Sequence, residues 1–200
     1  MVATFKTVGV VRFSVLSPTF NSDRYPSLEA VAEALFAQDR MQLRLHLFEH
    51  LCLASMLRQS DDDFTLVIAT SDRMPEPFLQ QLADMVAPHR NVLLQPYGPE
   101  NHFQILKKAY ASVPETGESH RILFRLDDDD ALDGEFIART KRLAKGLLPL
   151  QVNAETPFAI SFNRGIYLLK SETEPPRVVD SCERAPLSVG PSVVRPVHGK

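Results

Sequence analysis

Four consecutive carboxylates, Asp127–Asp130, follow directly after the mostly apolar segment 121–126. Like charges this close repel, so the pKa of at least one of them should rise unless a cation neutralises the run. A hard divalent ion that prefers oxygen ligands, Mg²⁺ or Mn²⁺, is the natural counter-charge, and such an ion also holds phosphate groups. The alternative is a solvated acidic turn in which Asp133 caps the next helix. The apolar strand that leads directly into the run favours the metal site.

Charged residues at other strands are candidates for ligand contacts. Arg12 interrupts the first apolar segment, where a charge is costly unless it is paired. We expect Arg12 to contact a nucleotide or an acidic loop, or else to reach solvent from the strand edge. Arg121 and Arg125 share one strand face and could contact a phosphate or the carboxylates, or pair with acidic neighbours on an exposed face. Asp72 follows the second predicted strand and could contact a nucleotide base or ribose.

Other polar groups give weaker evidence for a functional site. Asp61–Asp63 precedes a strand, so we expect a solvated turn there. His46 and His50 share a helix face and are expected to pack or lie at the surface. The sequence holds no G-x-G-x-x-G, G-x-x-x-x-G-K or G-x-S-x-G motif, which argues against a dinucleotide fold, a P-loop and the usual serine hydrolase. An aspartate-nucleophile phosphatase would carry its carboxylates after the first strand, with Thr or Val where Ala131 stands.

Strands and helices that position these groups alternate along residues 1–150. Apolar and β-branched runs predict strands at 7–16, 64–69, 91–95 and 121–126. Helical spacing predicts helices from Ser27, over 39–58, from Pro75, over 101–113 and over 133–148. In the second of these, a wide buried face is expected, made of Leu43, Leu47, Leu51 and Ala54 with Leu45, Phe48 and Leu53 beside them. This alternation predicts an α/β fold, a mostly parallel sheet with helices on both faces and a ligand site at the carboxyl ends of the strands.

In residues 151–200 the alternation of strands and helices gives way to short strands. Short strands are predicted at 158–162, 165–170, 177–180 and 192–195. We therefore expect one domain over 1–200, made of an α/β half, 1–150, and a β-rich portion, 151–200.

The composition sets wider limits. With 200 residues, 44% hydrophobic and 24% charged, the chain is an ordinary globular protein, neither disordered nor a coiled coil. A net charge of −3 gives no general attraction to nucleic acid or to an anionic membrane. Cys52 and Cys182 have no metal-ligand spacing and form no disulfide framework. Because no targeting or transmembrane segment is visible, we predict a cytoplasmic protein.

Several motifs resemble a known enzyme family. The stretch 53–68 is similar to the second segment of GT-A glycosyltransferases, and the carboxylate run resembles their D-x-D motif. More narrowly, four segments together resemble the rhamnosyltransferase family of bacteria: Arg12-Phe13-Ser14, Gln59-Ser60 with Asp63-Phe64, Arg125–Asp130, and Phe162-Asn163-Arg164-Gly165. The resemblance covers residues 8 to 165, most of the chain, and the long R-L-D-D-D-D run with F-N-R-G downstream is its most specific part.

The resemblance implies a GT-A-like, Rossmann-like fold and metal-dependent transfer of a sugar. The name of the family indicates that this sugar is rhamnose. The donor would be a nucleotide sugar bound by 1–150, and the acceptor a glycan or a lipid-linked molecule on the side of 151–200. Mn²⁺ or Mg²⁺ would bind Asp127 with Asp129, or Asp128 with Asp130, and act as a Lewis acid on the leaving diphosphate. Asn163 and Arg164 would lie near the acceptor or the diphosphate, unless they only form a β-turn.

An inverting member of that family also needs a general base near the acceptor hydroxyl. Asp133 and Glu135 are the first candidates, followed by Glu172 and Asp180. His198 is a candidate for a further metal ligand. The alternative function is an inactive or shortened homologue that binds nucleotide or glycan without turnover.

Overall fold

A six-stranded sheet forms the centre of the computed structural model, which describes residues 3–19, 24–153, 155–170 and 173–197. Its strand order is β3-β2-β1-β4-β8-β5, and the first four strands are parallel. Strand β8 runs antiparallel to both of its neighbours. The strands are β1 (Phe5–Arg12), β2 (Thr65–Ser71), β3 (Val92–Tyr97), β4 (His120–Asp127), β5 (Phe158–Ile160) and β8 (Ser192–Pro196). The predicted mostly parallel sheet is confirmed.

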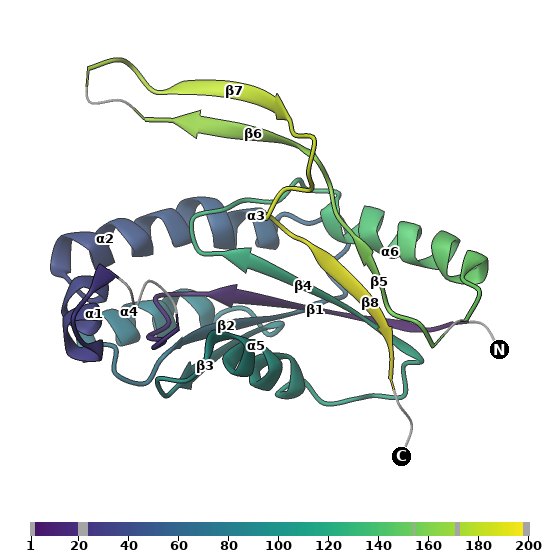
Figure 1. Ribbon diagram of the computed structural model, residues 1–200, viewed down its shortest axis with the longest axis horizontal. Coiled ribbons are helices and arrows are strands. Elements are labelled where there is room, and N and C mark those ends of the chain that lie inside the picture. The colour runs from purple at the N-terminus through teal and green to yellow at the C-terminus, as the bar shows by residue number, and fades with distance from the viewer. Residues whose placement is uncertain (1–2, 20–23, 154, 171–172, 198–200) are drawn as a thin grey trace.

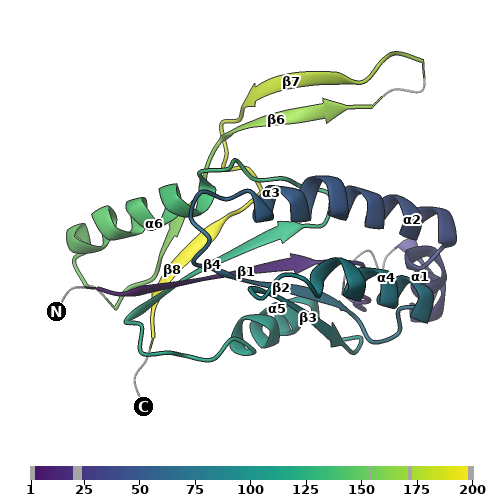
Figure 2. The ribbon, with the colours of Figure 1, turned by 180° about the vertical axis from the view of Figure 1, so that it is seen from behind.

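Helices cover both faces of this sheet, as the alternation of elements predicts (Figures 1 and 2). They are α1 (Leu28–Leu35), α2 (Gln38–Leu47), α3 (Ala54–Leu57), α4 (Glu76–Val86), α5 (His102–Ala111) and α6 (Phe136–Leu147). A π-helical segment, Phe48–Leu53, joins α2 to α3, and a 3₁₀ turn, Leu148–Leu150, follows α6. Helices α2 to α4 and α6 pack on one face, and α5 packs on the other.

The alternation of side chains along β1 builds both layers of the core. Val8 and Val10 face α5, whereas Val11 faces the α2 side, and all three are completely buried. Gly9 also lies on the α2 side, opposite Phe124 of β4. The absence of a side chain at Gly9 leaves room for the Phe124 ring, which packs against Phe136 of α6 at 5.3 Å between ring centroids.

The predicted buried face of the second helix is correct for Leu45, Phe48 and Leu53 and wrong for Leu43 and Leu51. Leu43 is 49% exposed and Leu51 is 37% exposed. The buried side chains are those of Met41, Leu45, Phe48, Cys52, Leu53 and Met56. The aromatic ring of Phe48 decides the orientation, because it packs edge to face on Phe13 at the end of β1, 5.3 Å between centroids.

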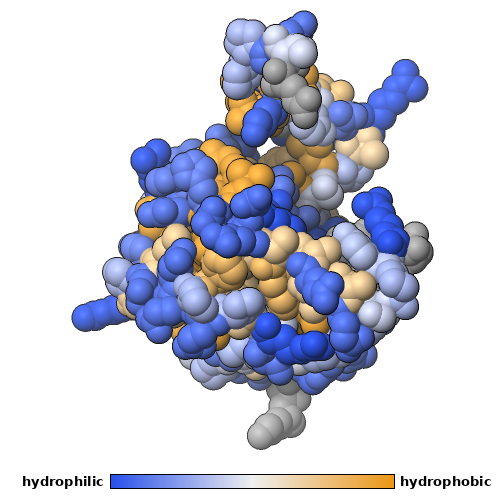
Figure 3. Space-filling view, turned by 90° about the vertical axis from the view of Figure 1, so that its left-hand side faces the viewer, coloured by the Kyte–Doolittle hydropathy of each residue, from blue (hydrophilic) through white to orange (hydrophobic). Residues whose placement is uncertain are grey.

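The β-rich portion divides between two places. Strands β5 and β8 extend the main sheet beyond β4, whereas β6 (Arg164–Leu169) and β7 (Arg177–Cys182) form a hairpin that stands off the body (Figures 1 and 2). The hairpin exposes Ile166, Tyr167, Leu168, Leu169 and Val178. Viewed from the end where β1 and β4 finish, the surface is hollowed beneath the hairpin, with apolar side chains in view (Figure 3). Among the described residues, no helix is long and apolar enough to cross a membrane.

Candidate functional site

The carboxyl ends of β1 and β4 meet at the point where the chain changes direction across the sheet. From β1 the chain adds β2 and β3 on one side, and it then returns to add β4 on the other. Open α/β sheets bind ligands in the crevice at such a point. Arg12, the last residue of β1, lies directly beside Asp127, the last residue of β4.

A cleft of about 310 Å³ opens at this edge of the sheet. Its walls come from the ends of β1 and β4, from α1 and α2, and from the start of α5. It is lined by Arg12, Ser14, Val15, Ser17, Leu35, Arg40, Arg44, His102, Ile105, Asp127, Asp128 and Asp129. The predicted carboxylates and Arg12 therefore lie together, and three further cationic or imidazole side chains join them.

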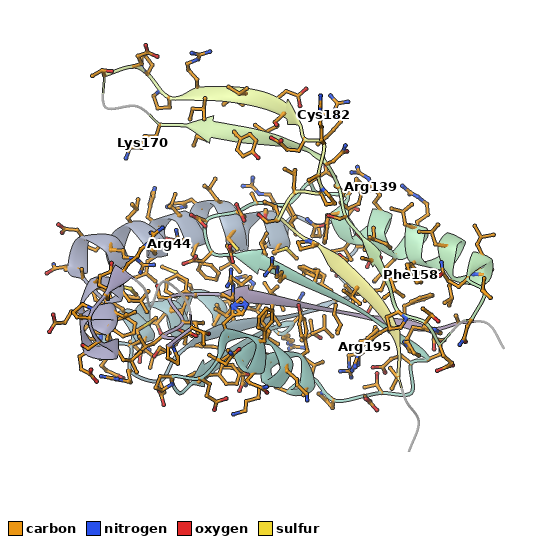
Figure 4. All side chains as sticks on the ribbon, viewed as in Figure 1. Arg44, Arg139, Phe158, Lys170, Cys182 and Arg195 are labelled. Carbon is orange, nitrogen blue, oxygen red and sulfur yellow. The ribbon has the colours of Figure 1, made fainter. Side chains whose placement is uncertain are left out.

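The carboxylates of the run point to two different arginines. Asp127 accepts hydrogen bonds from Arg12 Nε at 3.1 Å and Arg12 Nη2 at 2.5 Å. Asp128 accepts from Arg44 Nε at 3.0 Å and from Arg44 Nη2, a two-pronged contact. Arg44 comes from α2 (Figure 4). Arg44 Nη1 also donates to Asp129 at 2.6 Å. The side chains of Asp127 and Asp129 are 44% and 42% exposed, whereas that of Asp128 is 3% exposed.

Asp130 lies in a different environment from its neighbours. Within the described parts of the chain, its carboxylate makes no hydrogen bond or ion pair, although its backbone N–H donates to Asp127 O at 3.1 Å. Burial and the charges of Asp129 and Asp127 raise the pKa of Asp130 to about 6. Burial and the same acidic run raise the pKa of the Cys52 thiol, which therefore stays protonated at neutral pH. The repulsion expected from the run therefore acts on Asp130, together with its burial.

Arg40 and Ser14 also line the cleft and contact each other. Arg40 Nη1 donates to Ser14 Oγ at 3.1 Å and to Leu35 O at 2.6 Å. Burial and the charge of Arg44 lower the pKa of Arg40. Ser14 has a φ of +47°, a left-handed conformation that few residues other than glycine adopt. This conformation ends β1 at Arg12, earlier than the predicted end of the strand, and turns the chain into the cleft wall.

His102 begins α5 beside Arg12. Its Nδ1 lies 3.1 Å from Arg12 Nη1, a contact in which the guanidinium donates and the ring nitrogen accepts. Burial and the charges of Arg12 and Arg125 lower the pKa of His102, so the ring is neutral at pH 7. A neutral ring adds no charge to a cleft that already holds several arginines.

Arg125 and Asp72 lie near this edge of the sheet but do not line the cleft. Arg125 is on the same face of β4 as Asp127, close enough to influence His102. Asp72 follows β2 and is exposed. Arg121 lies at the opposite end of β4, where it pairs with Glu118 at 2.7 Å, so its role there is structural.

The candidate bases lie where α6 begins. Asp133 Oδ1 accepts from the backbone N–H of Glu135 at 2.9 Å and from Arg139 Nη2 at 3.2 Å. Both Asp133 and Glu135 are exposed and lie outside the cleft lining. Of the other two predicted bases, Asp180 lies on β7 in the hairpin, and Glu172 falls outside the described residues. The predicted metal ligand His198 also falls outside them.

Asn163 and Arg164 hold the base of the hairpin. Asn163 Nδ2 donates to Glu183 O at 3.1 Å, and Asn163 O accepts from Glu183 N at 2.8 Å. Arg164 Nη2 pairs with Asp180 at 3.0 Å across the two strands, and both side chains are exposed. In this structure both residues fix the hairpin, and neither lines the cleft.

Gln59 fixes the loop that follows the carboxylate run. Its Nε2 donates to Asp133 O at 2.8 Å, and its Oε1 accepts from Ile137 N at 3.0 Å. Ser60 N donates to Gly134 O at 2.8 Å beside it. The Gln59-Ser60 motif therefore positions the loop from outside the cleft.

Within the described residues, no group of three or more metal-ligating side chains converges on one point. The carboxylates of Asp127, Asp128 and Asp129 are instead held in ion pairs with arginines. An ion in this cleft would have to displace an arginine or take further ligands from a bound molecule.

Comparison with known proteins identifies the family to which the chain belongs. The model of a family described as "Putative rhamnosyl transferase" matches residues 6–200. No curated protein matches the chain in sequence. Among solved structures, the chain is similar to the mannosyltransferase PcManGT from Pyrobaculum calidifontis in complex with GDP-Man and Mn²⁺, with 13% identity and a TM-score of 0.43. The match covers 78% of this chain and 35% of that enzyme, so the chain spans about a third of its length.

Proposed function

Because the chain belongs to the rhamnosyl transferase family, we propose that it is a metal-dependent glycosyltransferase that moves rhamnose from a nucleotide donor to a glycan or lipid-linked acceptor. The observation that carries this proposal is the pair of exposed carboxylates, Asp127 and Asp129, at the switch point of the sheet. A donor diphosphate there would lie among Arg12, Arg40 and Arg44, whose guanidinium groups suit phosphate oxygens.

The donor atoms suit Mn²⁺ or Mg²⁺, and their exposure distinguishes the two possible pairs. Carboxylate oxygens are the ligands that hard divalent ions prefer. Asp128 is 3% exposed and faces Arg44, so it is a poor ligand. We therefore propose Asp127 and Asp129 rather than Asp128 and Asp130, with phosphate oxygens and water completing the shell. When bound, the ion would stabilise the negative charge of the leaving nucleoside diphosphate.

The remaining residues keep proposed roles outside the cleft. Asp72 and Arg125 lie at the donor edge and are proposed contacts for the nucleoside. Asn163 and Arg164 support the hairpin and are proposed to act on the acceptor side. Asp133 or Glu135 is the proposed base, and either would have to be reached by an acceptor that crosses the start of α6.

Thermal unfolding with UDP, GDP and dTDP, each with and without Mn²⁺, tests the donor site. A ligand at a hundredfold excess over its Kd stabilises the folded protein by about 2.7 kcal/mol. We expect one nucleotide to raise the melting temperature when Mn²⁺ is present, and the double variant Asp127→Asn with Asp129→Asn to lose this effect. Asp62→Asn, an exposed acid at the opposite edge of the sheet, is the matched control.

The corresponding nucleotide-rhamnose then tests transfer by release of the nucleoside diphosphate. Binding without release would favour the inactive homologue. No stabilisation by any nucleotide, in a chain that unfolds cooperatively, would refute the donor site.

A further inference from the structure

The cleft supplies its own counter-charges. Asp127 is paired with Arg12, and Asp128 and Asp129 are both paired with Arg44. Arg40 adds a third guanidinium to the lining of the same cleft. The positive and negative groups that line the cleft are therefore balanced, and the oxygens that a metal would need already accept hydrogen bonds from arginines.

We propose that Arg12 and the Nη1 group of Arg44 are exchangeable counter-ions that make the metal and the nucleoside diphosphate bind together. On this proposal, which rests on the proposed function, the ion takes the place of the guanidinium groups on Asp127 and Asp129. The released N–H groups then donate to the phosphate oxygens. The ion pairs within the protein are replaced by pairs between the protein and the two ligands.

Because the charges of the cleft are balanced, the binding of either ligand alone is unfavourable. A divalent cation by itself adds positive charge beside three arginines and competes with two of them for oxygens. A diphosphate by itself adds negative charge beside the carboxylate run. Entering together, the two ligands largely neutralise each other, so each should increase the affinity of the other, by the same factor in both directions.

The burial of the ion pairs separates those that exchange from the one that stays. The pair of Arg44 with Asp128 is nearly buried on the carboxylate side, at 3% exposure, and its two hydrogen bonds match the planar guanidinium. It holds the loop to α2 in either state. Asp127 and Asp129 are more than 40% exposed, so water and ligands reach their oxygens.

Manganese binding by the full chain tests this inference without measuring catalysis. Free Mn²⁺ is counted by electron paramagnetic resonance, with and without a saturating amount of UDP, GDP or dTDP, and the Mn²⁺ that each nucleotide binds in the absence of protein is subtracted. The nucleotide that binds should raise the Mn²⁺ affinity at least about tenfold, within the range of typical coupling between sites. Mn²⁺ should raise the affinity of that nucleotide by an equal factor, measured by calorimetry.

Removing a counter-ion should weaken the coupling between the binding of Mn²⁺ and the binding of the nucleotide. Arg12→Gln should raise the affinity for Mn²⁺ alone, lower the affinity for the nucleotide, and reduce the coupling factor. Arg12→Lys, which keeps the charge but loses the second hydrogen bond, should lie between it and the wild type. Arg90→Gln removes an exposed arginine before β3, at the opposite edge of the sheet, and should behave like the wild type. Melting temperatures confirm that each variant is folded.

The outcomes distinguish this inference from the proposed function. If Mn²⁺ and nucleotide both bind but independently, or if Arg12→Gln binds Mn²⁺ no better than the wild type, the exchange is refuted and the donor site stands. If a folded chain binds neither ligand, the proposed function fails and the exchange fails with it.

Discussion

Replacing Gly9 with alanine should destabilise the protein, because the added methyl group enters space that the Phe124 ring occupies. A Cβ atom at Gly9 would lie 2.2 to 2.7 Å from three atoms of this ring. Phe124 is completely buried and packs against Phe136, so the ring cannot withdraw. Overpacking of a core costs about 1–3 kcal/mol. Replacing glycine by alanine also makes the unfolded chain less flexible, which stabilises the folded state by about 0.5–1 kcal/mol. We expect a net loss of about 1–2 kcal/mol.

Urea denaturation followed by circular dichroism measures this loss. Gly146→Ala is the matched control, because Gly146 lies in α6 with no atom within 4 Å of its added methyl group. There the same substitution should stabilise the protein by up to about 1 kcal/mol. Adding Phe124→Leu to the Gly9→Ala variant should recover part of the loss, because the smaller side chain makes room. A Gly9→Ala variant within about 0.5 kcal/mol of the wild type would refute the reasoning.

Two further predictions concern charged pairs. Asp128→Asn should lower the free energy of unfolding by about 3 kcal/mol, because Arg44 keeps its charge in a mostly buried place. A loss below about 1 kcal/mol, measured by urea denaturation, would contradict the proposal that this pair anchors the loop to α2. Burial alone would raise the pKa of Glu118, but hydrogen bonds from the Thr116 backbone and the Arg121 side chain outweigh it and lower the pKa to about 2. A carboxylate with a lowered pKa stabilises the fold above its ordinary value of 4.5 and loses this effect as the pH falls toward 2. Glu118→Gln should therefore reduce the dependence of stability on pH in that window, and an unchanged profile would show that the pair does not stabilise the fold.

The order and type of the main elements could be predicted because each buried strand is a short apolar run. The segment 64–69 and the strand β2, Thr65–Ser71, differ only at their ends. The end of β1 could not be predicted, because the left-handed Ser14 is held by Arg40, which is 26 positions away. Similarly, nothing local distinguishes Leu43 from Leu45, and only packing against the sheet decides which is buried.

Four of the twelve residues that line the cleft, Arg12 and Asp127–Asp129, could be predicted from the sequence. The carboxylate run and Arg12 are visible because charges adjoin or interrupt apolar strands. Arg44 was missed, because an arginine on a helix is ordinary and its partners lie more than 80 positions away. His102 was missed for a related reason, since its contact with Arg12 depends on how α5 crosses the sheet. The spacing of Arg40 and Arg44 by one helical turn was the one available indication of a shared cationic face.

The π-helical segment between α2 and α3 shows where this protein tolerates a change of length. A π turn holds more residues than an α turn, so Phe48–Leu53 contains surplus backbone within a continuous helix. Removing one exposed residue there, such as His50, would leave an ordinary α-helical turn. Arg44 before the segment and Gln59 after it would keep their orientations. The same deletion elsewhere in the helix would rotate one of them by about 100° away from its partners. Deletions of one residue in relatives should therefore concentrate in this turn.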